Sequence, residues 1–205
     1  LDLSDATFIA HAVYSEMEET ADFTCGNADV NQLVWNSKWS QKGNFCDVPT
    51  DCPTRERAAW TGDAGLYVDT GLMLMDSYNV YRKWLAQCRY GQYPEGKVAN
   101  IAPPNSKGSF MTAMLAGSVG WGDACIIVPM DRKYGDVRIL EENYEMMKNW
   151  YAFLESRAEN NAIQSGIDYG EWCEPGTNPM MSMQNGNFDV ATAYFAHSGE
   201  TLSEI

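Results

Sequence analysis

The stretch Thr61-Gly-Asp-Ala-Gly-Leu-Tyr-Val-Asp-Thr-Gly-Leu-Met-Leu-Met75 predicts a helix that is apolar on nearly all of its faces. Its large apolar side chains surround the helix axis instead of forming one stripe: Leu66, Val68, Leu72, Met73 and Leu74. A helix of this kind is usually buried among other elements, whereas a surface helix is amphipathic. The stretch therefore predicts a helix enclosed by other helices, and we place the rest of the fold around it.

Five further helices are indicated by N-cap residues, helical spacing of apolar residues and terminating glycines. Their expected ranges are about 27–43, 77–87, 121–134, 136–154 and 187–205, the last beginning at Asn187 or Asp189. The 121–134 helix is apolar throughout and the 136–154 helix is amphipathic, as expected of inner and outer helices in an α/α barrel. A helical bundle or a solenoid would also fit the periodicity, although no internal repeat supports a solenoid. Long loops are expected at 90–109 and 165–187.

The composition excludes several classes of protein. Lys and Arg number 14 and Asp and Glu 28, which gives a net charge of −14 and argues against a nucleic-acid partner. No apolar run approaches the roughly 20 residues of a membrane helix. The first residues lack the basic region of a signal peptide, and the compartment stays undetermined. Six cysteines without a CxxC pair and two histidines supply a metal site poorly, so we expect no metal and free thiols.

The densest group of chemical side chains is Asp51-Cys-Pro-Thr-Arg-Glu-Arg-Ala-Ala-Trp-Thr-Gly-Asp63. If residues 56–63 form helical turns, Glu56, Trp60 and Asp63 share one face because of their i, i+4, i+7 spacing. An indole flanked by carboxylates suits a pyranose, whose C–H face rests on the ring while its hydroxyls donate to the acids. A glycosidase also needs a carboxylic acid and a second carboxylate across the sugar. The alternative is a solvated loop with salt bridges.

Two further segments pair a tryptophan with a carboxylate beside glycine, where a backbone can approach a ligand closely. They are Gly120-Trp-Gly-Asp123 and Tyr169-Gly-Glu-Trp172. Alternatively, each tryptophan belongs to the core and each acid is a helix N-cap or first-turn charge, as Asp123 would be at the start of its helix. Three such pairs at loop–helix junctions together favour a sugar pocket.

These motifs resemble those of the bacterial α-L-rhamnosidases, glycoside hydrolase family 78. The 51–63 stretch is similar to the signature of that family. The blocks Trp121-Gly-Asp-Ala through Val128-Pro129, Tyr134-Gly-Asp136, Tyr169-Gly-Glu-Trp172 and Asn187-Phe-Asp-Val-Ala-Thr-Ala-Tyr194 follow in the order of the family. The resemblance covers about residues 25–205.

The resemblance implies an all-α fold, the (α/α)6 barrel of six-hairpin glycosidases, with its first half in residues 25–205. Residues 1–24 would be an extended connector or strand from a preceding β-sandwich domain. The implied activity is inverting hydrolysis of terminal α-L-rhamnosides without a cofactor, on a rhamnosylated carbohydrate, with no nucleic-acid or membrane partner. The implied general acid is Glu56, and the implied substrate-binding residues are Asp51, Arg55, Trp60, Asp63, Trp121, Asp123 and Trp172.

The general base of the family is a glutamate in the second half of the barrel, and no residue up to Ile205 matches it. An inverting site holds its two carboxyl groups roughly 6.5–9.5 Å apart around a water molecule. We therefore expect the 205-residue chain to be a piece of a longer enzyme and inactive by itself. Half a barrel would leave apolar helix faces uncovered, which favours self-association.

Two other hypotheses fit the residues. The first is a different helical-barrel glycosidase, such as an unsaturated glucuronyl hydrolase or a trehalase-like enzyme. The second is a carbohydrate-binding helical domain without catalytic activity. A downstream glutamate opposite Glu56 and a preference for a 6-deoxy-L-sugar would distinguish the rhamnosidase from both.

Overall fold

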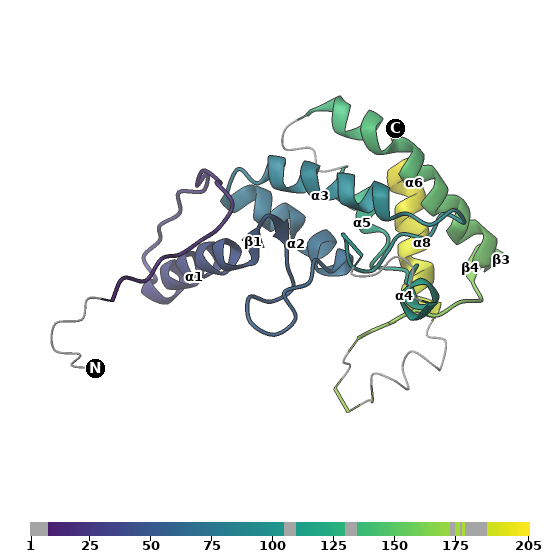
Figure 1. Ribbon diagram of the computed structural model, residues 1–205, viewed down its shortest axis with the longest axis horizontal. Helices are drawn as coiled ribbons and strands as arrows, with labels where there is room; N and C mark the ends of the chain where they lie inside the picture. The colour runs from purple at the N-terminus through teal and green to yellow at the C-terminus, as the bar shows by residue number, and fades with distance from the viewer. Residues whose placement is uncertain (1–7, 105–109, 130–134, 173–174, 177, 179–187) are drawn as a thin grey trace.

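The computed structural model describes residues 8–104, 110–129, 135–172, 175–176, 178 and 188–205. Helices dominate the described chain (Figure 1). They are α1 (Ala28–Asn44), α2 (Thr61–Leu74), α3 (Tyr78–Gly91), α4 (Phe110–Leu115), α5 (Ala124–Ile127), α6 (Val137–Arg157) and α8 (Phe188–Leu202). Two antiparallel hairpins of two-residue strands complete the order: β1 (Phe45–Cys46) with β2 (Val48–Pro49), and β3 (Ala158–Glu159) with β4 (Ala162–Ile163).

Most of the expected helices are confirmed to within a few residues. Asn27 caps α1, where its side-chain oxygen accepts from the backbone N–H groups of Asp29 at 2.9 Å and Val30 at 3.3 Å. Asp136 caps α6 by accepting from the backbone N–H of Arg138 at 3.1 Å. These caps satisfy donors that have no partner within the helix, so they set where each helix begins.

The single helix expected over 121–134 is wrong. Gly120 has a φ of +88°, and the chain then forms tight turns before the four-residue helix α5. Pro129 cannot donate the next helical hydrogen bond, so α5 does not continue through it. Residues 130–134 lie outside the described residues. The last helix ends at Leu202, short of the expected Ile205, and α4 and the two hairpins were not predicted.

The helix α2 is buried on only one side in this chain. Val68 and Leu72 belong to the core, whereas Leu66 is 77% exposed and Met73 is 65% exposed. Helix α1 likewise exposes apolar side chains, among them Leu33 and Trp35. The expectation that α2 is enclosed all round therefore holds for one face within the described residues.

The N-terminal segment 8–24 contains neither a helix nor a named strand, and Glu19 makes an isolated bridge to Met75 at the end of α2. Two salt bridges attach it to α1, because the Glu19 carboxylate contacts Lys38 at 3.0 Å and Lys42 at 2.6 Å. In Figure 1 this segment runs along α1 and α2 on the side of the molecule away from α6 and α8.

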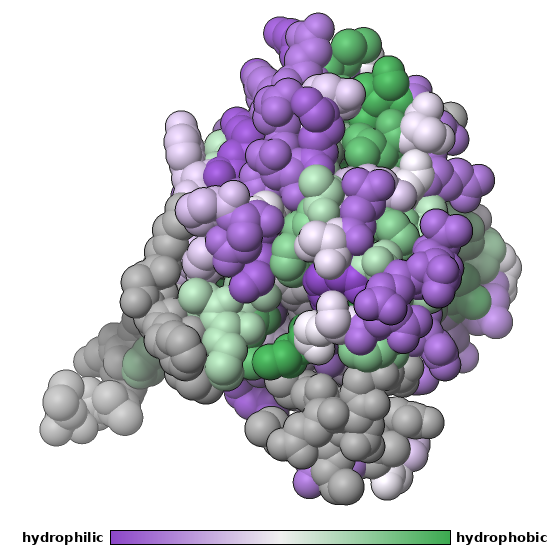
Figure 2. Space-filling model, turned by 90° about the vertical axis from the view of Figure 1, so that its right-hand side faces the viewer, coloured by the Kyte–Doolittle hydropathy of each residue, from purple (hydrophilic) through white to green (hydrophobic). Residues whose placement is uncertain are grey.

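The core connects α2 with helices that come later in the chain. Helix α2 packs against α5, which in turn contacts α6 and α8. Two fully buried tryptophans belong to the same core, Trp84 of α3 and Trp150 of α6. Figure 2 views the molecule from the α6 and α8 end, where the coloured surface is largely hydrophilic with apolar side chains in between. None of the described helices is long and apolar enough to cross a membrane.

Asp123 is a buried junction of the core and not a pocket residue. Its side chain is inaccessible to solvent and accepts from Gly120 N at 2.7 Å, Trp150 Nε1 at 3.2 Å and Ser198 Oγ. Burial raises the pKa of Asp123, and the three hydrogen bonds oppose that rise by favouring the ionised form. The expectation that Asp123 contacts a substrate is therefore corrected: its carboxylate joins α5, α6 and α8.

Replacing Ser198 with alanine tests this role. The Ser198→Ala variant leaves a buried carboxylate with one donor fewer, and we expect it to lower the free energy of unfolding by about 1.5–3 kcal/mol. Urea unfolding measures the loss. The control is Ser203→Ala, an exposed serine just beyond α8, with an expected change below about 0.5 kcal/mol. Equal effects of the two variants would show that the Ser198–Asp123 bond does not support the core.

Candidate functional site

One open pocket of about 200 Å³ collects most of the residues that the sequence motifs single out. Its walls come from the loop before α2, the start of α2, the turn before α5 and the segment before residue 173. The lining residues are Asp51, Glu56, Trp60, Asp63, Trp121, Tyr169 and Trp172. Three carboxylates thus face four aromatic rings across one cavity.

The loop that carries Asp51 and Glu56 is closed by hydrogen bonds of its own. Asp51 N donates to Ala58 O, and Ala58 N donates to Asp51 Oδ1, both at 3.0 Å. Arg57 adopts a left-handed conformation with a φ of +50°, which no helix contains. The helical turns expected over 56–63 are therefore wrong before Thr61, where α2 begins.

Glu56 nevertheless meets Trp60, through a side-chain hydrogen bond. The indole Nε1 of Trp60 donates to Glu56 Oε2 at 2.9 Å. The tryptophan is itself fixed by the fold, because its backbone pairs with Ile101 and it precedes the first residue of α2. One carboxylate oxygen of Glu56 is thus held by Trp60. The other oxygen has no hydrogen-bond partner among the described residues.

Asp63 stands in the first turn of α2, where the helix dipole favours a negative charge. Its side chain is solvent-exposed, yet the surrounding pocket walls partly desolvate the carboxyl, and this desolvation raises its pKa, with a further rise from the nearby charges of Asp51 and Glu56. The described lining contains no lysine or arginine to balance these acids. The pocket therefore suits a ligand that donates several hydrogen bonds and carries no negative charge.

Tyr169 organises the aromatic side of the pocket. Its ring makes edge-on contacts with three tryptophans, at centroid distances of 6.1 Å to Trp60, 4.7 Å to Trp121 and 5.4 Å to Trp172. Such edge-to-face pairs are favourable beyond the area they bury. Gly62 admits the Trp121 ring, because a Cβ at residue 62 would lie 2.9 Å from the indole.

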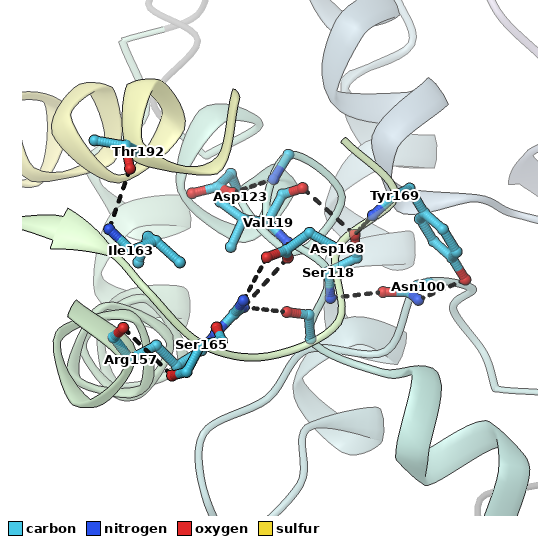
Figure 3. Close-up of polar contacts among 12 residues, drawn as sticks. Asn100, Ser118, Val119, Asp123, Arg157, Ile163, Ser165, Asp168, Tyr169 and Thr192 are labelled. Atoms are coloured by element: carbon cyan, nitrogen blue, oxygen red, sulfur yellow. Dashed lines mark hydrogen bonds and ion pairs between the residues drawn. The ribbon is translucent and has the colours of Figure 1, made fainter. Parts of the chain in front are cut away.

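A buried polar network holds Tyr169 from behind (Figure 3). Asn100 Nδ2 donates to the Tyr169 hydroxyl at 3.0 Å, and Tyr169 N donates to Ser118 Oγ at 3.0 Å. The backbone carbonyl of Asn100 accepts from Thr61 N at 2.8 Å, so the same residue also holds the start of α2. The two sides of the pocket are therefore connected through Asn100.

The network ends in a buried ion pair between Arg157 and Asp168. Asp168 Oδ1 also accepts from Val119 N at 2.7 Å, and Arg157 donates to Gly117 O at 3.1 Å and to Ser165 O at 2.7 Å. A buried pair is tolerated when its remaining hydrogen-bonding groups are satisfied, as they are here. The pair fixes the residue directly before Tyr169 to the end of α6.

The structure brings together six of the eight residues that the sequence singled out: Asp51, Glu56, Trp60, Asp63, Trp121 and Trp172. Arg55 is exposed on the loop and is not part of the lining, and Asp123 lies in the core. The sequence reasoning missed Tyr169 as a lining residue, although it opens the block that contains Trp172. Its position one residue before the glycine of that block was the available signal.

Metal-binding groups do not gather in the part of the chain that the structure describes. No three His, Cys, Asp or Glu side chains there are arranged to hold a metal ion. The five described cysteines are free thiols, and Cys173 lies outside the described residues.

The pocket of this helical domain has the groups that a glycoside hydrolase uses, namely carboxyl groups for the scissile bond and tryptophan rings as apolar surfaces for a sugar. Residues 18–205 match the family model described as the bacterial alpha-L-rhamnosidase 6 hairpin glycosidase domain. Because this match covers most of the sequence, the chain belongs to that family.

Several curated relatives are named alpha-L-rhamnosidase. One from Formosa agariphila is 36% identical in an alignment of 201 positions that covers 93% of this chain and 20% of the relative. One from Alteromonas sp. (strain LOR) is 34% identical over 93% of this chain and 21% of the relative. The chain thus spans about a fifth of the length of the curated relatives it matches.

Solved structures agree with this assignment. The alpha-L-rhamnosidase of Streptomyces avermitilis complexed with L-rhamnose has a TM-score of 0.81 and 31% identity, over 93% of this chain and 18% of that one. The alpha-L-rhamnosidase from Dictyoglumus thermophilum has a TM-score of 0.80 and 33% identity, over 93% of this chain and 21% of that one. The fold of the described chain is therefore that of the six-hairpin glycosidase domain.

The raised pKa of Asp63 predicts a pH-dependent gain in stability on its replacement by asparagine. A carboxyl whose pKa is higher in the folded than in the unfolded state destabilises the fold once it is ionised. We expect Asp63→Asn to raise the melting temperature modestly at pH 7 and the gain to vanish below the ordinary range of aspartate pKa values. The control is Asp69→Asn, which removes a charge from the same helix outside the pocket, away from Asp51 and Glu56. A loss of stability at pH 7 would contradict the prediction.

The buried ion pair behind Tyr169 predicts a large stability effect. Replacing Asp168 with alanine leaves the Arg157 guanidinium buried without its carboxylate, and we expect a loss of about 3–5 kcal/mol in the free energy of unfolding. The control is Glu142→Ala, which breaks the exposed pair with Arg82 and should cost about 1 kcal/mol or less. Urea unfolding of both variants makes the comparison. Similar losses would show that the Arg157–Asp168 pair is not a main support of the pocket.

Proposed function

We propose that this chain forms part of the catalytic domain of an enzyme that hydrolyses terminal α-L-rhamnosides with inversion of configuration. The observation that carries the proposal is the position of Glu56, held by Trp60 in a pocket that also contains Asp51 and Asp63. Membership of the rhamnosidase domain family and relatives with that activity in their names support it.

The pocket chemistry suits a rhamnose ring. Asp51 and Asp63 are acceptors for sugar hydroxyls, and the rings of Trp121 and Trp172 offer apolar surfaces to the C–H groups and the methyl group of a 6-deoxy sugar. A pocket that lacks a cation in its described lining also favours a neutral sugar over an anionic uronic acid. This difference favours a rhamnosidase over an unsaturated glucuronyl hydrolase.

In the proposed reaction Glu56 is the general acid. Its carboxyl proton goes to the glycosidic oxygen as the bond from that oxygen to the anomeric carbon breaks, and the aglycone leaves as an alcohol. A water molecule attacks the opposite face of the anomeric carbon and loses its proton to a second carboxylate, the general base. The hydrogen bond from Trp60 Nε1 occupies one oxygen of Glu56 and leaves the other for the proton.

The second carboxylate belongs, in this proposal, to a part of the enzyme beyond this chain. The exposed apolar side chains of α1 and α2, Leu33, Leu66 and Met73, are then covered by the remaining helices of an (α/α)6 barrel. The chain by itself would bind sugar weakly and would not turn over, because the water-activating group is missing.

The test uses the full-length protein that carries this chain, with 4-nitrophenyl α-L-rhamnoside and methyl α-L-rhamnoside as substrates. We expect the wild type to release β-L-rhamnose first, observed by proton NMR. We expect Glu56→Gln to lower kcat/KM for the methyl glycoside by about 10²–10⁴-fold. The loss should be much smaller for the nitrophenyl glycoside, because its leaving group needs little protonation.

The matched control is Glu141→Gln, which removes an exposed glutamate of α6 outside the pocket. It should keep wild-type activity on both substrates. Equal losses on both substrates for Glu56→Gln would remove the general-acid role. Hydrolysis of other aryl glycosides but not of the rhamnoside would show that the enzyme acts on a different sugar. Binding of L-rhamnose without any hydrolysis would support a non-catalytic sugar-binding domain.

A further inference from the structure

A second cavity of about 160 Å³ adjoins the pocket lined by Asp51, Glu56 and Asp63, which we call the acid pocket. It shares two walls with the acid pocket, the side chains of Trp60 and Tyr169. Its other walls include Asn100, Ile101, Pro104 and Leu115. We call this cavity the side groove.

The side groove is apolar in what it offers to a ligand. Ile101, Pro104 and Leu115 contribute hydrocarbon, and Trp60 and Tyr169 contribute ring surfaces. The amide of Asn100 is already used: its Nδ2 donates to Leu115 O at 2.6 Å and to the Tyr169 hydroxyl, and its Oδ1 accepts from Ser118 N at 3.3 Å. A second sugar would find few hydrogen-bond partners on these walls, so its hydroxyls would add little to its binding here.

The position of the side groove indicates that it contacts the leaving group. The indole of Trp60 lies between the groove and the acid pocket and holds Glu56 through its Nε1. The group attached to the anomeric carbon must pass Glu56, because Glu56 protonates the oxygen that joins them. The groove that shares Trp60 is therefore on the side of the departing alcohol.

A third cavity lies on the other side, where it shares Asp51 and Asp63 with the acid pocket. Its lining includes polar side chains such as Gln41, Asn44 and Thr50. Phe45, Leu66 and Tyr67 also line the third cavity, but the side groove has fewer polar side chains, so it is the better fit of the two for a hydrophobic group.

We propose that the side groove binds the aglycone and selects rhamnosides whose aglycone is flat and apolar, such as an aromatic alcohol, over those with a second sugar. This inference rests on the proposed rhamnosidase function. Ile101 and Leu115 are its specificity-determining residues, and they contact the aglycone without taking part in proton transfer.

The experiment measures binding of 1-thio-α-L-rhamnosides, which resist hydrolysis, to the full-length protein by calorimetry. Three S-linked groups are compared: methyl, 2-naphthyl and glucosyl. We expect the naphthyl compound to bind about tenfold or more tightly than the methyl compound, since it fills an apolar site. The glucosyl compound should bind no more tightly than the methyl compound.

The Leu115→Ala and Ile101→Ala variants test whether these two side chains cause the tighter binding of the naphthyl compound. Each should lower the affinity for the naphthyl compound several-fold and leave the affinity for the methyl compound within twofold. The matched control is Met114→Ala, a neighbouring and more exposed side chain of α4 that does not line the groove. It should keep the full naphthyl preference. Thermal unfolding of each variant establishes that it is folded.

Each result decides the proposal. Equal affinity for the naphthyl and methyl compounds overturns it, as does tighter binding of the glucosyl compound. A parallel loss for both the naphthyl and methyl compounds in Leu115→Ala and in Ile101→Ala shows that these residues only support the fold, and it also overturns the proposal. Failure of the methyl compound to bind and of any rhamnoside to be hydrolysed contradicts the rhamnosidase function itself.

Discussion

The buried ion pair between Arg157 and Asp168 is the interaction on which the pocket depends. It joins the end of α6 to the segment that carries Tyr169, and both partners are almost fully buried. Charges are stable in such a place only when each of their hydrogen-bonding groups has a partner. The backbone groups of Gly117, Val119 and Ser165 supply those partners, so the pair fixes the paths of two loops at once.

The ion pair positions the aromatic side of the pocket, and the aromatic side chains in turn position the acids. Tyr169 follows Asp168 directly and is contacted by three tryptophans, one of which, Trp60, holds the Glu56 carboxylate. Asn100 connects Tyr169 with the first residue of α2, two positions before Asp63. The proposed acid and one of the proposed sugar-binding carboxylates are thus positioned by the same network, although they lie in different elements.

The pocket combines contributions that stabilise the folded state with one that destabilises it. The aromatic contacts and the buried network favour the folded pocket, whereas desolvating the Asp63 carboxylate, and placing it beside Asp51 and Glu56, does not, as its raised pKa shows. A pocket that holds uncompensated acids in this way is expected at a functional site, where the ligand supplies the missing donors. The side groove is different, because its polar groups are satisfied internally and it offers hydrophobic contact.

The sequence by itself determined α1, α2, α3, α6 and α8 to within a few residues, because the spacing of apolar residues and, in α1 and α6, the N-caps are local signals. It also identified six pocket residues, because their motifs place acids and tryptophans at loop–helix junctions. Only the tertiary structure decided that residues 51–59 form a loop, that Asp123 is a core junction and that Tyr169 lines the pocket. The last two outcomes depend on contacts of Asp123 with Trp150 and Ser198 and of Tyr169 with Asn100, which lie 27 to 75 residues apart in the chain, and no local pattern reports such partners.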